Sequence, residues 1–167
     1  MTVDAAVADA RLAAMEFDDA QAWLRARPTL MEPLAAEVWV IDPAYSQVLL
    51  VRHRVRGWVP PGGTVEPGET PRGAAVRELV EEAGVVGDLL PAPAAVAVRS
   101  FRADWAPTLS LSYCAIMGPD VPLGGECGQP PRWVDLDETW ESVFPEDRDR
   151  IRAYVHRLAA GQVVGAR

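Results

Sequence analysis

Lysine is absent from this chain of 167 residues, so arginine supplies its side-chain positive charge apart from two histidines. A Walker-type phosphate loop needs a lysine, and its absence excludes that way of holding a nucleotide. Acidic residues outnumber arginines by 24 to 16, which gives a net charge of −8. This balance argues against extended nucleic-acid binding, which needs a basic surface. A small phosphate substrate can still bind where metal ions neutralise the site.

Cysteine and long apolar runs are scarce as well. Cys114 and Cys127 form no C-x-x-C pair and are too few for a disulfide framework, which favours a reducing compartment. No apolar run approaches the roughly 18 residues of a membrane span. The early acids of the N-terminal segment do not suit a signal peptide. We therefore expect a cytoplasmic protein without a membrane partner.

The pattern of elements suits one domain with an extension. An alanine-rich stretch over residues 2–27 predicts helices, and helices are also expected at 70–83 and 146–160. Strands are predicted at 36–41, 47–52, 94–103, 108–117 and 132–136. Strands flanked by helices indicate an α/β fold. We predict a helical extension over residues 1–34 and the main domain over 35–162.

The most informative segment runs from Gly63 to Val85 and reads GTVEPGETPRGAAVRELVEEAGV. Glu78, Glu81 and Glu82 stand at i, i+3 and i+4, so on a helix their carboxylates share one side. Like charges at that spacing repel, and a cation would relieve the repulsion. Magnesium takes carboxylate oxygens and keeps phosphates and waters as further ligands. The pattern predicts a magnesium site for a phosphate substrate, with a solvated acidic face as the alternative.

Capping residues predict the limits of this helix. Thr70 suits the N-cap, Pro71 the first helical position and Gly84 the C-terminal stop. We expect the carboxylates to lie opposite an apolar arc that packs on a sheet. The residues of the predicted arc are Ala75, Val76, Leu79, Val80 and Ala83.

The same window matches the Nudix box, G-x5-E-x7-R-E-U-x-E-E-x-G-U with U aliphatic, at every fixed position. The segment 57–63, GWVPPGG, also resembles the approach to that box. The chain is therefore similar to MutT-like Nudix hydrolases. The resemblance implies an α/β/α sandwich with a mixed central sheet. It also implies cleavage of the pyrophosphate in a nucleoside diphosphate derivative, with magnesium or manganese as the cofactor.

The resemblance assigns roles within the box. Glu78 and Glu82 would be the principal metal ligands, with Glu81 adding a ligand or acting through water and the Gly62 carbonyl as a further ligand. Arg77 would hold the carboxylates by ion pairing. Glu69 would brace the loop against the helix.

The catalytic base is less constrained by the box. It is either a box glutamate or a carboxylate from a more distal loop, where Glu126 is the first candidate as base or metal ligand and Asp120 the second. Residues 129–131 are Gln-Pro-Pro, where relatives carry an acid before the tryptophan. This departure leaves the distal ligand open.

Substrate-binding candidates come from outside the box. Arg52, Arg54 and Arg56 alternate, and on a continued strand they would line one face and hold phosphate oxygens; a solvated edge is the alternative. Trp58 is a candidate for stacking on a base. Phe101, Trp105 and Trp133 are further candidates for stacking, with core packing as the alternative.

Several substrates and functions stay open. The proline typical of ADP-ribose enzymes and the tyrosine typical of dinucleoside polyphosphate enzymes are missing, so elimination favours nucleoside triphosphates, including oxidised ones. ADP-ribose, nucleotide sugars and dinucleoside polyphosphates are the alternative substrates. A nucleotide-sensing module without turnover is a further alternative, and so is an interaction protein that docks through its N-terminal helices. We expect a small nucleotide as the partner, with a homodimer left open.

Overall fold

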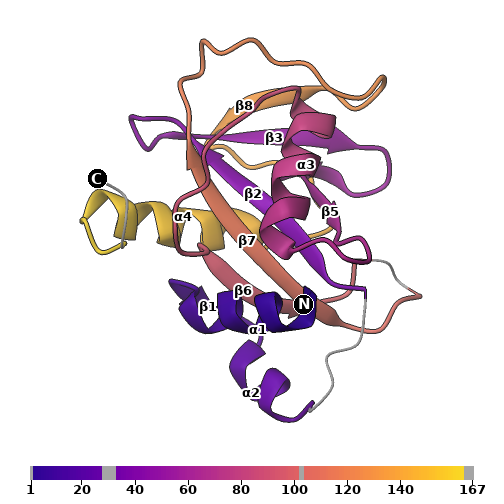
Figure 1. The fold of residues 1–167 in the computed structure, drawn as a ribbon. Helices are drawn as coiled ribbons and strands as arrows, with labels where there is room; N and C mark the ends of the chain where they lie inside the picture. Colours follow the sequence, from indigo (N-terminus) through magenta and orange to yellow (C-terminus); the bar gives the residue numbers. More distant parts are fainter. Residues whose placement is uncertain (1, 28–32, 102–103, 164–167) are drawn as a thin grey trace.

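The computed structural model describes residues 2–27, 33–101 and 104–163 (Figure 1). Its strands are β1 (Met15–Glu16), β2 (Ala35–Ile41), β3 (Gln47–His53), β4 (Gly57–Val59), β5 (Gly62–Thr64), β6 (Ala95–Arg99), β7 (Thr108–Ile116) and β8 (Pro131–Asp135). The helices are α1 (Thr2–Leu12), α2 (Ala20–Arg25), α3 (Pro71–Ala83) and α4 (Asp147–Ala159). Among these helices none is long and apolar enough to cross a membrane.

The strands form one mixed sheet. Its main path runs β1-β6-β7-β2-β3-β4, while β5 pairs with β2 and β8 pairs with β3. β2 and β7 are parallel over seven residue pairs, and β1 is parallel to β6. The other pairings are antiparallel. The prediction of a mixed central sheet is confirmed.

β2 shows why helices cover both faces of this sheet. All seven of its residues are buried. Val38 and Val40 belong to the core under α3, whereas Trp39 and Ile41 belong to the core under α4. Side chains alternate between the faces of a strand, so a fully buried strand needs cover on both sides. Figure 1 shows α3 and α4 on opposite sides of the sheet, which confirms the α/β/α sandwich.

The predicted limits of α3 are confirmed. The Thr70 side chain accepts a hydrogen bond from the Gly73 amide at 3.1 Å, and Pro71 is the first helical residue. Gly84 ends the helix with φ 68°, in the left-handed region that glycine adopts without strain.

The apolar arc of α3 was predicted only in part. Ala75, Leu79 and Ala83 are fully buried, but Val76 and Val80 are 36% and 43% exposed. Their inclusion was wrong because the buried face is rotated toward Ala74 and Pro71, which are buried instead. The buried face therefore takes in part of the side assigned to the carboxylates.

The N-terminal region contributes to the same sheet and core. Helices are present as expected, but the two-residue strand β1 was not predicted and pairs with β6. Ala6, Ala10 and Ala20 are fully buried in the core that lies under α3. The boundary between residues 34 and 35 stays a prediction.

The short strands β4 and β5 were also not predicted, because residues 57–64 are rich in glycine and proline, which do not favour strands. The strand expected over 94–103 ends at Arg99, and residues 102–103 lie outside the described part of the chain.

Candidate active site

β5 lies beside α3, so that the backbone of Gly62 and Gly63 is close to the carboxylates of Glu82 and Glu78. The Gly62 amide donates a hydrogen bond to Oε2 of Glu82 at 2.8 Å. A Cβ atom at Gly63 would lie 2.3 Å from Oε1 of Glu78, and one at Gly62 would lie 2.5 Å from Cβ of Glu37. Gly62 therefore requires glycine, since a side chain would clash with β2, whereas a side chain at Gly63 would displace the Glu78 carboxylate.

The rotation of α3 directs Glu78 and Glu82 inward. At about 100° per residue, both fall between Ala74 and Ala75, which are fully buried. The Glu78 side chain is 14% exposed, whereas that of Glu81 is 52% exposed. Two of the three box carboxylates therefore face β5 and the third faces outward.

Arg77 connects three carboxylates. Its guanidinium binds Glu69 through two hydrogen bonds of 3.1 Å, from Nε to Oε1 and from Nη2 to Oε2. Nη1 donates to Glu78 at 2.7 Å and to Glu81 at 3.2 Å, and Nη2 also donates to the Thr64 carbonyl at 3.1 Å. The hydrogen bonds to Arg77 lower the pKa of Glu69. The contacts expected of Arg77 and Glu69 are present, while their roles in a reaction stay predictions.

Glu82 accepts no bond from an arginine among the described residues. Burial, with a smaller contribution from the nearby charge of Glu78, raises its pKa to about 7, against the hydrogen bond from Gly62. Burial also raises the pKa of Glu78, although Arg77 opposes this. Two adjacent, partly buried acids, of which only Glu78 is bonded by an arginine among the described residues, form a negative site that a cation would neutralise.

The donors suit a hard divalent cation. Carboxylate oxygens of Glu78 and Glu82 lie beside the Gly62 backbone, and oxygen is the donor that magnesium prefers. Within the described ranges no group of three His, Cys, Asp or Glu side chains stands ready to hold a metal. The protein side of such a site would therefore consist of few ligands, with phosphate and water completing it, as is usual for magnesium.

The predicted arginine stripe is not formed. β3 ends at His53, whose Nδ1 accepts hydrogen bonds at 3.1 Å from the amides of Val55 and Arg56, so the chain turns there. Arg54 is exposed in that turn. The prediction was wrong because the alternation assumed a strand that continued to Arg56.

Arg52 and Trp58 lie away from the box carboxylates. They pair across β3 and β4, with the Arg52 guanidinium 5.9 Å from the Trp58 ring. Trp58 packs against the core under α4, the face opposite to α3. These two candidates are therefore not brought together with Glu78 and Glu82.

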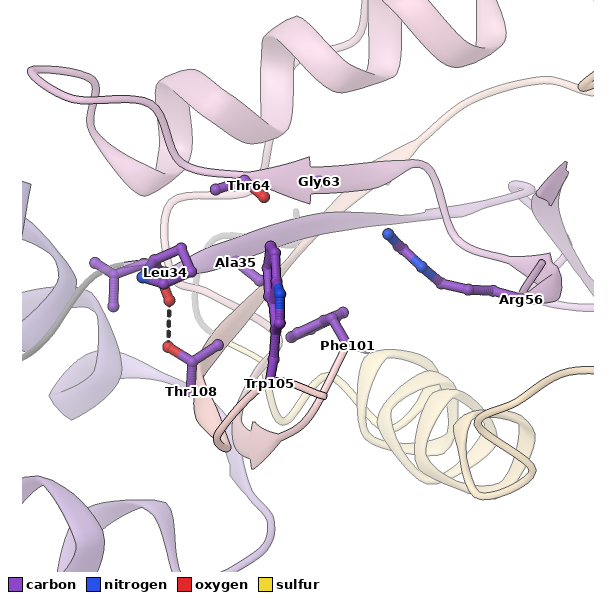
Figure 2. Close-up of a pocket in the computed structure, with 9 residues that line it drawn as sticks. Leu34, Ala35, Arg56, Gly63, Thr64, Phe101, Trp105 and Thr108 are labelled. Atoms are coloured by element: carbon purple, nitrogen blue, oxygen red, sulfur yellow. Dashed lines mark hydrogen bonds between the residues drawn. The ribbon is translucent and has the colours of Figure 1, made fainter. Parts of the chain in front are cut away.

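Arg56 is the arginine that the fold brings to the site. It is partly buried, and burial lowers its pKa, although the nearby charges of Glu82 and Glu78 oppose this lowering. It lines the same small cavity as Gly63 (Figure 2). From the sequence, Arg56 was considered only as the last arginine of the stripe. Its position depends on the turn that the His53 ring stabilises.

The distal loop approaches the C-terminal end of α3. The Gly124 amide donates to the Ala83 carbonyl at 2.8 Å, and Gly125 has φ 126° and packs on the Glu82 carbonyl. Glu126 follows in the same loop, is exposed and is bonded by Gln129. Its charge contributes to the raised pKa of Glu82, which puts it in the vicinity of the site.

Two hollows meet at Arg56 and Phe101. One is a cleft of about 700 Å³, and the other is a smaller cavity of about 40 Å³ that extends to β5. Arg56 and Phe101 line both of them. Figure 2 shows Trp105 and Phe101 in the smaller cavity, below the strand that carries Gly63 and Thr64. Phe101 and Trp105 are thus aromatic residues that line the cavity at β5. Trp133 packs against the core under α3, in agreement with the core alternative.

Comparison with known proteins identifies the family. The profile of the NUDIX domain matches residues 31–158, which is most of the chain. The chain therefore belongs to the Nudix family.

Solved structures agree on the fold. A NUDIX family hydrolase from Clostridium perfringens covers 77% of this chain and 99% of its own at 18% identity, with a TM-score of 0.64. The Ap4A hydrolase of C. elegans covers 80% and 100% at 19% identity, with a TM-score of 0.57. The pyrophosphohydrolase of Bacillus subtilis, solved as a mutant, covers 80% and 86% at 20% identity, with a TM-score of 0.59. Identities this low show the fold alone.

A short segment is closer to curated proteins. It is 66% identical over 32 residues to the mouse diphosphoinositol polyphosphate phosphohydrolase 3-alpha. The match covers 19% of this chain and 20% of that protein, so the chain spans only about a fifth of the length of the curated relatives that it matches.

Proposed function

We propose that this protein is a metal-dependent hydrolase that cleaves the pyrophosphate linkage of a nucleoside diphosphate derivative. The observation that carries the proposal is the inward placement of Glu78 and Glu82 against the glycine strand β5. A partly buried carboxylate without an ion pair, as Glu82 is among the described residues, is costly to keep charged unless a cation binds. The family assignment supports the same conclusion.

Each box residue has a proposed task. Glu78 and Glu82 would hold magnesium or manganese with the Gly62 carbonyl, and the exposed Glu81 would contribute through water. Arg77 would fix the orientation of Glu78 and Glu81, and Glu69 would fix that of Arg77. A metal held there would activate a water and neutralise charge on the phosphates.

The remaining steps fall to side chains around the metal ligands. Arg56 is proposed to hold a phosphate oxygen through its planar guanidinium, in place of Arg52 and Arg54. Glu126 is proposed to take a proton from the attacking water or to add a metal ligand. Phe101 would support a base by ring contact.

The lining of the large cleft favours a nucleoside over an inositol polyphosphate. Its described residues are His53, Val55, Arg56, Ser100, Phe101, Asp104, Val143 and Phe144. One arginine beside aromatic and aliphatic side chains suits a planar base near a phosphate. A ring bearing many phosphates would need several cations.

The substrate within this class is a separate question. Elimination from the sequence favours nucleoside triphosphates, including oxidised ones. ADP-ribose, nucleotide sugars and dinucleoside polyphosphates are the alternatives. A sensing module without turnover is disfavoured because every box glutamate is retained.

A substrate panel tests the proposal. The purified protein is incubated with each of these nucleotide classes, with magnesium, with manganese and with a chelator, and the products are separated by chromatography. We expect metal-stimulated cleavage at the pyrophosphate of at least one class. Binding of nucleotides without metal-stimulated product would contradict the proposal and favour a sensing module.

A further inference from the structure

α2 and the segment 104–108 border a second cleft, which the proposed catalytic roles do not use. Its volume is about 400 Å³, within the range of roughly 300–1,000 Å³ typical of ligand sites. Trp23 and Arg27 line it from the end of α2, and Trp105 lines it from the other segment. Trp23 and Arg27 precede the part of the chain that matches the family profile, whereas the other lining residues lie within it, so the N-terminal region completes this cleft.

The second cleft adjoins the candidate active site. It shares Pro33, Trp105 and Thr108 with the small cavity of Figure 2. That cavity reaches Gly63, which abuts the Glu78 carboxylate. The large cleft shares Arg56 and Phe101 with the same cavity but leads toward His53 and Val143. A diphosphate near Arg56 would thus have a hollow available for a group at each of its ends.

The side chains of the second cleft suit a nucleoside. Trp105 supplies an indole ring, and planar bases stack on such rings whatever their identity. The Arg27 guanidinium lies over the Trp23 ring, 4.0 Å from its centre, so this stacked pair presents a cation to a base or to an additional phosphate. Arg27 is exposed and can bind such a phosphate without a change in the fold.

We propose that this cleft binds a second nucleoside and that the preferred substrate is a dinucleoside polyphosphate. The inference rests on the proposed function and selects one of its alternatives. One nucleoside lies against Phe101 in the large cleft, and the other lies against Trp105 and the stacked pair of Trp23 and Arg27. In the reaction a water oxygen bonds to one phosphorus, the bridging P–O bond breaks with its electron pair leaving on the second phosphate, and the water protons pass to solvent. The products are two nucleotides.

Substitutions at the end of α2 test the assignment. Turnover of diadenosine tetraphosphate and of ATP is measured for Arg27→Ala and Trp23→Ala. Loss of a stacking contact or a phosphate contact is expected to lower kcat/KM for the dinucleotide by about tenfold, mainly through KM, with little change for ATP. Arg25→Ala removes an exposed arginine of the same helix that does not line the cleft, and Trp23→Phe keeps an aromatic ring. Both controls are expected to behave like the unaltered protein.

The outcomes separate the two proposals. Equal losses for ATP and the dinucleotide, or no loss for either, would overturn the second-nucleoside assignment. So would a loss confined to nucleotide sugars or ADP-ribose. Trp23 also packs against the core, so Trp23→Ala could fail to fold. In that case the result for Arg27→Ala decides between the outcomes. Absence of metal-stimulated cleavage of every nucleotide by the unaltered protein would instead refute the proposed function itself.

Discussion

Two arginines in this molecule gather carboxylates, and they do so in different ways. Arg77 binds Glu69 and Glu81, at most eight residues away in the chain, at the surface of α3. Arg99 binds Glu37 and Asp147, which are 62 and 48 residues away, in the interior. The first group follows from a local motif, whereas the second exists only once β2, β6 and α4 have come together.

The two groups also differ in how completely their charges are satisfied. The Arg99 side chain is 9% exposed, and Glu37 and Asp147 are 8% and 1% exposed. Oε1 of Glu37 accepts further hydrogen bonds from Ser112 at 2.7 Å and from Trp39 at 2.9 Å. The neighbourhood of Arg77, by contrast, includes Glu82 with only the Gly62 amide bonded to it among the described residues. Similar ionic groups thus pair their charges in the interior in one place, and in the other they leave the Glu82 carboxylate for which we propose a cation.

Removing the central arginine of the buried group should have the largest effect on stability. Arg99→Met would leave two buried carboxylates without their partner, and such a change costs about 3–5 kcal/mol. Urea unfolding measures the loss. Arg150→Met, which removes the partner of the more exposed Asp18, is the control and should cost about 1 kcal/mol or less. Equal losses in the two variants would mean that burial does not distinguish these ion pairs.

Glu82→Gln should have the converse effect, removing activity while keeping the fold. The glutamine still accepts the Gly62 amide, but it loses the charge that would hold the metal. We expect kcat with magnesium to fall by roughly two to three orders of magnitude, the scale for losing a group that stabilises transition-state charge. Circular dichroism and thermal melting check the fold. Glu81→Gln is the matched control, and the greater exposure of Glu81 predicts a smaller loss; full turnover in Glu82→Gln would refute the assigned role.

Substitution of Arg56 should lower activity more than substitution of Arg54, because the fold places Arg56 at the site and leaves Arg54 exposed in the turn. Arg56→Gln is expected to lower kcat/KM by roughly tenfold to a hundredfold, the value of a hydrogen bond to a charged group. Arg54→Gln, at an exposed position, should change it by about twofold or less. Steady-state kinetics on the substrate found in the panel gives both numbers. A larger loss for Arg54→Gln would restore the strand interpretation.

The pH dependence of stability provides a finer test. Burial raises the pKa of Glu82 to about 7 from an ordinary value of 4.5, so the folded protein holds this proton more tightly than the unfolded chain. Below about pH 4.5 the group is protonated in both states and has no effect. From there to about pH 7 the metal-free protein loses stability as the pH rises, and above that the loss is constant.

Comparison with Glu82→Gln isolates this contribution. Thermal melting in metal-free buffer should show a smaller fall in Tm across that window for the variant than for the unaltered protein. Burial also raises the pKa of Asp147, against the attraction of Arg99, but Asp147 is present in both proteins and cancels in the difference. Parallel profiles for the two proteins would show that the Glu82 carboxyl is not perturbed by folding.

The helix of the box could be predicted because its signals are local. Thr70, Pro71 and Gly84 fix the two ends of α3 through contacts within a few residues. Strands β2 and β3 could likewise be predicted from their own apolar residues. What the pattern did not determine was the rotation of α3 about its axis, because the position of β5 sets which side of the helix is buried. Val76 and Val80 were misassigned for that reason.

The surroundings of the carboxylates were harder to predict from the sequence. Arg56 depends on a turn stabilised by the His53 ring. Phe101 and Trp105 come to the same cavity from the connection between β6 and β7. The Glu37–Arg99–Asp147 group needs three elements that are far apart in the chain. Such long-range placements leave no periodicity or spacing in the sequence.

The parallel pairing of β1 with β6 has a consequence for any shortened form of this protein. A variant that begins after residue 34 would lose this pairing and leave the backbone groups on that side of β6 without their partners. A bare strand edge is a template for joining another copy of the chain. Self-association of such a truncated variant would therefore reflect an uncovered edge, and it would say nothing about a natural dimer.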